Sequence, residues 1–213
     1  SCNRRSRSPK PRNYFNEWKR EQILVEESGP CFYFYVQTFT HPLSGKKSER
    51  RAILGRLKLE PFEKGIVVAH EKTLSKPKAD RRRLLEATHT NFSPIFGLYE
   101  EAFPQSLYEQ IASKPPLYSA RDDQSVEHQL WRVNDVTNQD LICRGLRSQK
   151  VYIADGHHRY QTALDYSLKC RAESSGAGEL GSDFVLMALV HFHDPGLALL
   201  PTHRIVLPFD GFE

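Results

Sequence analysis

The sequence lacks several features that would place it in a specialised class of protein. No run in its 213 residues approaches the roughly 18 apolar residues that a transmembrane helix needs, and no apolar core follows the basic N-terminus as in a secretory signal. It has four cysteines, none in CxxC spacing, too few for a disulfide scaffold. We therefore expect neither a membrane protein nor a secreted one, but a protein of the reducing cytoplasm.

A strong excess of one charge is also missing. The formal net charge is +4, and part of it lies in the N-terminal stretch SCNRRSRSPKPR, whose Arg, Ser and Pro cannot bury apolar surface. This balance argues against a nucleic-acid partner, which would need clustered cations along a groove. We predict a flexible basic tail over 1–12 and a single domain over 13–213. Because the chain lacks an initiator Met and stops close after an apparent strand, we expect a fragment of a longer protein.

The rest of the chain carries enough apolar and aromatic side chains for a core, and its helix and strand patterns alternate. These patterns predict helices over 13–28, about 75–88, 103–112, 138–147 and from about His157 to Cys170. They predict strands over 31–39, 50–60, 66–69, 93–100, 116–121, 127–133, 150–155, 183–192 and 200–208. There is no internal repeat and no linker of domain length. The sequence therefore predicts one α/β or α+β domain.

The stretch IADGHHR combines a strand end, a glycine turn and a helix start with an unusual charge distribution. The first turn of a helix exposes free N–H groups and the positive end of the dipole, so acidic residues are favoured there. Here that turn holds His157, His158 and Arg159, and Gly156 allows the backbone to approach a ligand closely. A bound phosphate or carboxylate would supply the missing negative charge. Asp155 precedes the turn and is suited to hold Mg²⁺ against phosphates or to accept a proton.

Two other interpretations of the histidines are weighed against this one. His157 falls near the apolar face of the helix, one turn before Tyr160, where a buried histidine with purely structural hydrogen bonds is common. A zinc site made by His157 and His158 is less favoured, because adjacent helical residues point in different directions and lack the one-face i, i+4 spacing.

The stretch IADGHHRYQTAL resembles the signature of the ParB/sulfiredoxin-like superfamily, and specifically a large prokaryotic family of unknown function, DUF1015. The likeness extends through VVAHEKTLSKPKADRRRLLEATHTNFSPIFGLY, EHQLWRV and LPTHRIV, most of the chain after about residue 31. It implies a ParB/sulfiredoxin-like core with additional mixed strands and helices. In that superfamily the equivalent turn binds nucleotide phosphates. The resemblance therefore implies a nucleotide ligand, ATP, ADP or CTP, together with Mg²⁺.

The superfamily's relatives have different activities, and the sequence separates them. Sulfiredoxins place a reactive cysteine where this chain has His157, and partition proteins follow the motif with a helix-turn-helix that is missing here. Free serine kinases resemble the chain both at DGHHR and at a His-Glu pair, here His70 and Glu71. The resemblance thus favours a small-molecule kinase or a nucleotide hydrolase.

A kinase needs a phosphate cradle, a metal and a proton acceptor. Gly156, His157, His158 and Arg159 are the candidates for the cradle, with His70 and Arg204 as further phosphate contacts. Asp155 is the candidate for the metal. Glu71 is the candidate general base, and the alternative for it is a solvent-facing residue at a strand end. A non-catalytic module whose nucleotide changes its association state, as in the partition proteins, is the competing function.

Overall fold

The computed structural model describes residues 11–71, 76–176, 178–198 and 200. Within these residues the helices are α1 (Pro11–Arg20), α2 (Lys76–Thr88), α3 (Gln105–Ala112), α4 (Val136–Arg147) and α5 (His157–Glu173). The strands are β1 (Phe32–Thr40), β2 (Lys47–Lys58), β3 (Val67–Val68), β4 (Ile95–Tyr99), β5 (Tyr118–Arg121), β6 (Glu127–Val133), β7 (Val151–Asp155) and β8 (Phe184–His191). The prediction of mixed α and β structure is confirmed. None of the described helices has the length and apolar character to cross a membrane.

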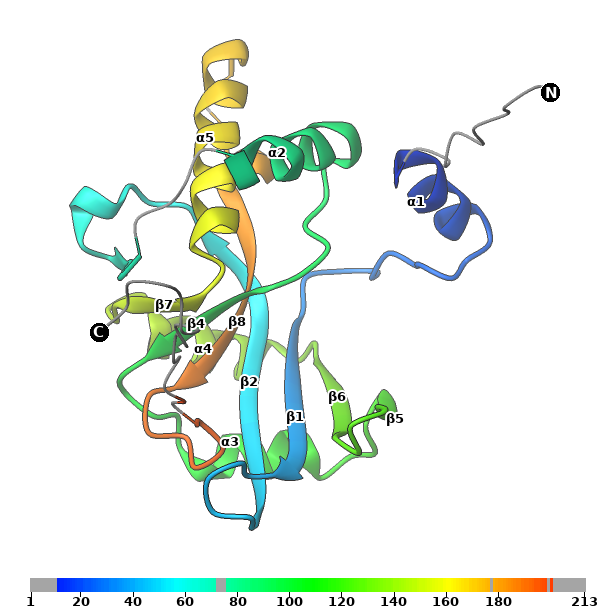
Figure 1. The fold of residues 1–213 in the computed structure, drawn as a ribbon, viewed down its shortest axis with the longest axis vertical. Helices are drawn as coiled ribbons and strands as arrows, with labels where there is room; N and C mark the ends of the chain where they lie inside the picture. Colours follow the sequence, from blue (N-terminus) through cyan, green and yellow to red (C-terminus); the bar gives the residue numbers. More distant parts are fainter. Residues whose placement is uncertain (1–10, 72–75, 177, 199, 201–213) are drawn as a thin grey trace, which may run out of the picture.

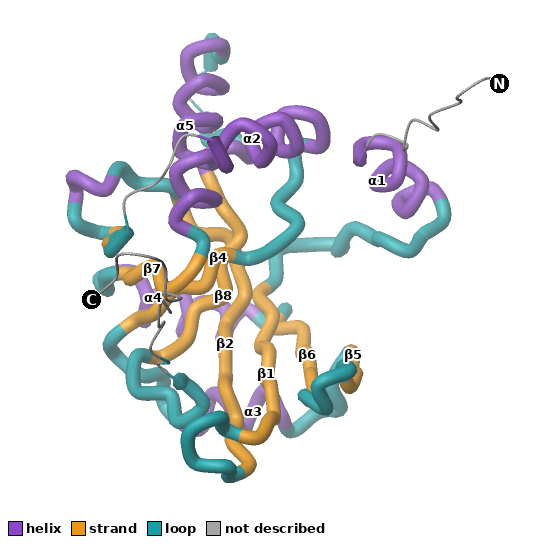
Figure 2. The backbone as a smooth tube through the Cα atoms, viewed as in Figure 1, coloured by secondary structure: helices purple, strands orange, loops and turns teal. Residues whose placement is uncertain are grey.

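All eight strands form one sheet in the order β3-β7-β4-β8-β2-β1-β6-β5 (Figures 1 and 2). β1 and β2 form an antiparallel hairpin, and β6 and β5 extend the sheet beyond it. On the other side β4 pairs parallel with β8, and β3 pairs parallel with β7. Two strands from distant parts of the sequence therefore run in the same direction at the edge where β7 leads into α5.

The main core lies on one face of the sheet. Leu107 of α3, Ile142 of α4 and Tyr160 of α5 all belong to it, so these three helices pack on that face against residues such as Met187 and Ile53. Alternating side chains of the strands form a smaller apolar cluster on the opposite face, with Ala52, Leu98 and Val190 at its centre. Because α5 is anchored in the main core, the position of its first turn is fixed relative to β7.

The predicted helix over 13–28 is wrong in its extent, since α1 ends at Arg20. Gln22 adopts a left-handed conformation with φ of 57°. Its amide donates to the carbonyl of Lys19, and the amide of Ile23 donates to the carbonyl of Trp18. This is the Schellman arrangement of a helix C-terminus, which Gly usually provides. Gln at this position gave no sequence signal for the stop.

Some predicted features lie outside the described residues. They are residues 1–10 of the predicted tail, residue 75 at the start of the predicted helix over about 75–88, and residues 201–208 of the predicted final strand over 200–208, with Arg204. Pro11 and Arg12, which end the predicted tail, lie in α1. The predicted helix from about His157 to Cys170 is confirmed and extends to Glu173.

Gly97 tests the packing at the centre of this sheet. A Cβ there would lie 2.7 Å from Met187 Cε, 2.9 Å from Leu189 Cδ2 and 3.0 Å from Val151 Cγ1. We expect Gly97→Ala to destabilise the protein by about 1–3 kcal/mol, because the added methyl overpacks a filled core. Urea unfolding measures this. Gly29→Ala is the control, since no atom lies within 4 Å of its Cβ position; equal effects of the two changes would contradict the packing argument.

Candidate functional site

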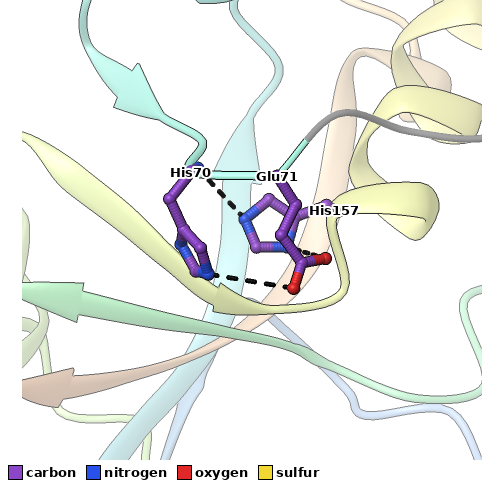
Figure 3. Close-up of side chains that lie close together, drawn as sticks. All are labelled: His70, Glu71 and His157. Carbon is purple, nitrogen blue, oxygen red and sulfur yellow. Dashed lines mark hydrogen bonds and ion pairs between the residues drawn. The ribbon is translucent and has the colours of Figure 1, made fainter. Parts of the chain in front are cut away.

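The candidate site forms where β3 and β7 end side by side. In the parallel register Val67 lies opposite Val151 and Val68 lies opposite Tyr152, so both chain segments leave the sheet in the same direction. The segments that follow the two strands then meet at one edge of the sheet, where ligands commonly bind in α/β proteins. Figure 3 shows the result: His70 and Glu71 lie against His157 at the start of α5.

Three side chains converge there. Glu71 Oε2 lies 3.5 Å from His157 Nδ1, and Glu71 Oε1 lies 3.9 Å from His70 Nε2. The rings of His70 and His157 meet edge to face, with centroids 4.4 Å apart. One nitrogen or oxygen atom from each of the three residues lies within 4.8 Å of those of the other two. This group could hold a metal ion, and it is not the His157–His158 pair that the sequence analysis considered.

His157 is buried and fixed, whereas its two partners are open to solvent. Its side chain is 2% exposed, compared with 62% for His70 and 61% for Glu71. Its Nε2 accepts a long hydrogen bond of 3.4 Å from the amide of His70. Burial and the nearby His70 ring lower the pKa of His157, and this outweighs the opposite effect of the Glu71 and Asp155 carboxylates. The neutral ring with Nε2 as acceptor therefore carries its hydrogen on Nδ1, which faces Glu71.

The predicted glycine turn between β7 and α5 is present. Gly156 has φ of 101°, a left-handed value that strains any residue with a Cβ. In the first turn, the amides of His157, His158 and Arg159 have no hydrogen-bond acceptor among the described residues, and no acidic residue lies there. Three N–H groups are thus available to an anion. A bulge in β7 opposite Phe96 and Gly97 turns the strand end toward this helix.

Arg159 is held by the protein itself. Its Nη2 donates to Asp155 Oδ2 at 2.7 Å, and its Nη1 donates to Ser93 Oγ at 2.9 Å and to the carbonyl of Pro94. Its Nε and Nη2 lie about 3 Å from the point that a Cβ of Gly156 would occupy. Arg159 therefore ties the end of β7 to the start of β4 and covers the glycine turn. Nothing in the sequence indicated its contacts with Ser93 and Pro94.

Asp155 and His158 complete the turn. The Asp155 side chain is 76% exposed and uses one oxygen for Arg159. The His158 Nδ1 is buried without a hydrogen-bond partner among the described residues. Beside Arg159, Arg81 and Ser93 help to line a cavity of about 170 Å³.

Tyr160 anchors α5 on its buried side. Its hydroxyl donates to the carbonyl of Glu60 at 2.8 Å and accepts from the amide of the same residue at 2.9 Å. Burial raises the pKa of Tyr160 to about 12, so the hydroxyl keeps its proton at neutral pH. The first turn of α5 is thus anchored on the side opposite to solvent.

A known protein family matches this chain. A family model described as "Protein of unknown function (DUF1015)" matches residues 2–213, almost the whole chain. The chain belongs to this family. Searches of the curated proteins and of the solved structures gave no match. Membership of DUF1015 confirms the family resemblance inferred from the sequence and leaves the activity to be argued from the site.

Among the candidate residues, the structure brings together Glu71 and His70 from one segment with Asp155–Arg159 from the other. Arg204 lies outside the described residues. The convergence of His70, Glu71 and His157 as one group was not foreseen, because His70 had been assigned to phosphate and Glu71 to proton transfer.

The burial of His157 makes stability depend on pH. A histidine whose folded pKa lies below its unfolded value of about 6.5 stabilises the folded state fully above that pH. Stability is then lost as pH falls through 6.5 toward the folded pKa, because the unfolded chain binds the proton first. We expect the urea midpoint of the wild type to fall more between pH 7.5 and 5.0 than that of His157→Gln. His193→Gln, at an exposed histidine, is the control and should show the same pH dependence as the wild type. If the urea midpoint of His157→Gln fell as much as that of the wild type, this account would be contradicted.

Proposed function

We propose that the start of α5 binds the phosphates of a nucleotide and that the protein transfers a phosphoryl group from it to a small hydroxyl compound. One observation carries the proposal: the carboxylate of Glu71 lies beside the first turn of α5, 3.5 Å from His157, although the two segments are distant in sequence. An anion-binding turn and a proton acceptor thus share one edge of the sheet. The resemblance of DGHHR and His70-Glu71 to a ParB/sulfiredoxin-like kinase supports the same assignment.

The phosphates would be bound mainly by backbone. The free amides of His157, His158 and Arg159 offer three donors and the positive end of the α5 dipole. The ring of His158, whose Nδ1 has no hydrogen-bond partner among the described residues, would be a further contact for the same anion. His157 is too deeply buried to be a principal phosphate contact, and in this proposal it positions Glu71 instead.

A phosphate that binds at this turn would compete with Asp155 for Arg159. Asp155 neutralises Arg159 in the structure, so the guanidinium attracts an anion strongly only when that ion pair is broken. An arriving phosphate would compete for Arg159 and leave Asp155 with a free carboxylate. Mg²⁺ usually binds one or two carboxylates together with phosphate oxygens, and Asp155 fits that donor set. Bound there, the ion would neutralise charge on the phosphates.

Glu71 would accept the proton of the attacking hydroxyl. Its side chain is exposed, so a small acceptor can reach it, and the Nδ1–H of His157 faces its Oε2. Proton acceptance needs hydrogen-bond reach to the substrate, and the exposed position allows it.

The same ion pair supports a second function, a nucleotide-responsive module without catalysis. Arg159 joins the end of β7 to Ser93 and Pro94 before β4. A nucleotide that drew Arg159 away from them would loosen that junction and change the local surface. Nucleotide binding without any turnover would identify this function.

Nucleotide binding tests the proposed site directly. We expect ATP, ADP or CTP with Mg²⁺ to bind the wild type in isothermal titration, and Arg159→Gln to bind at least about tenfold more weakly, because a charge-assisted hydrogen bond contributes about 1.5–3 kcal/mol. Arg83→Gln, at an exposed arginine of α2, should bind as wild type. The unfolding midpoints of both variants are measured in parallel, so that a structural loss is recognised. Failure of every nucleotide to bind the wild type would refute the proposal.

Turnover tests the role of Glu71. We expect Glu71→Gln to keep nucleotide binding and to lose most phosphoryl transfer to pooled hydroxyl metabolites, because Gln keeps the shape of Glu and removes the proton acceptor. Phosphorus NMR measures the phosphorylated product. Glu63→Gln, at an exposed glutamate, is the control. Full activity of Glu71→Gln would exclude it as the base.

A further inference from the structure

We propose that His70, Glu71 and His157 bind a divalent transition-metal ion, with Zn²⁺ as the representative case. The inference goes beyond the proposed function and does not require a nucleotide. Two imidazole nitrogens and one carboxylate are ligands that such ions prefer, whereas Mg²⁺ and Ca²⁺ prefer oxygen alone. The site is therefore chemically distinct from the Mg²⁺ contact assigned to Asp155.

The spacing of the three groups fits an ion better than it fits direct contact. Two ligands of a tetrahedral ion with bonds of about 2.1 Å lie roughly 3.4 Å apart. His157 Nδ1 lies 3.5 Å from one carboxylate oxygen of Glu71 and His70 Nε2 lies 3.9 Å from the other, and one ligand atom from each of the three residues lies within 4.8 Å of the other two. Among the described residues, the side chain of Glu71 makes no hydrogen bond, although two imidazoles face it. The three polar groups converge without satisfying one another, and an ion at their centre would satisfy all three.

The burial of one metal-binding residue and the exposure of the other two are also suitable for binding an ion. His157 is buried and set by the core packing of α5, so one ligand is already in place. His70 and Glu71 are more than half exposed, so their side chains have room to close on an ion. An exposed pair also gives the ion a path from solvent. Three protein ligands leave a fourth position open, as in catalytic rather than structural zinc sites.

One existing contact opposes binding and is weak. Ligation through Nδ1 of His157 would move its ring hydrogen to Nε2, which now accepts the amide of His70. That hydrogen bond would be lost, but at 3.4 Å it is near the limit of such bonds. Three metal bonds outweigh it.

Because His157 is the first residue of α5, an ion bound there would lie near the free amides of that helix. A ligand that carries phosphate or carboxylate could therefore bind the ion and the helix N-terminus together. With the ion in place, Glu71 would be a ligand, and a water or hydroxyl at the open position would lose its proton to solvent more readily than it does when free. Glu71 alone has the base role only in the metal-free protein.

The experiment uses the whole chain without a histidine tag. EDTA removes bound metal from the protein, and dialysis then removes the EDTA. We expect one equivalent of Zn²⁺ to bind in isothermal titration, and one equivalent of Co²⁺ to give the visible absorption of a low-coordinate site. His70→Ala and Glu71→Gln, both at exposed positions, should fold normally and weaken binding by at least about tenfold. His193→Ala and Glu63→Gln are the matched controls. Absence of Zn²⁺ and Co²⁺ binding by the wild type, or equal binding by His70→Ala, would overturn the inference.

Failure of this inference can be told from failure of the proposed function. If the wild type binds no Zn²⁺ but Mg²⁺-nucleotide binding needs Arg159, the metal site is refuted and the nucleotide site stands. If Zn²⁺ binds and is lost in His70→Ala while no nucleotide binds, the metal site stands alone.

Discussion

The parallel pairing of β3 with β7 is the contact on which the candidate site depends. It is short, with Val67 and Val68 beside Val151 and Tyr152, yet it directs the two chain segments to the same edge of the sheet. If β3 paired in the opposite direction, Glu71 would lie at the far end of β7 from His157. The apolar core beneath, with Val67 and Val151 both buried, holds this register. The chemistry at the edge is therefore a consequence of strand direction.

Burial of one histidine between two exposed residues gives the site its character. His157 belongs to the packed start of α5, and Tyr160, one turn later, is bonded to Glu60 beneath it. A side chain fixed in this way keeps its orientation whether or not a ligand is present, whereas His70 and Glu71 can adjust. Rigid support on one side and exposed ligands on the other are suitable for binding a small charged group.

The charge balance at the turn is the second determinant. Asp155 and Arg159 neutralise each other, so the turn carries little net charge apart from the helix dipole. Arg159 also bonds to Ser93 and Pro94, which makes its guanidinium a structural link. Any anion that recruits Arg159 must replace these bonds. Binding at the predicted cradle would thus require free energy to break the bonds of Arg159, which would favour a multiply charged ligand such as a polyphosphate over a single carboxylate.

The sequence by itself determined the local structure. Apolar periodicity located almost all of the described helices and strands, and the glycine between Asp155 and His157 predicted a tight turn, because these features depend on residues close in the chain. It failed where an unexpected residue, Gln22, ended α1. Only the tertiary structure decided which residues meet. That His70 and Glu71 lie against His157, and that Arg159 reaches Ser93, follow from strand order and direction, which depend on how the whole core packs rather than on any local pattern.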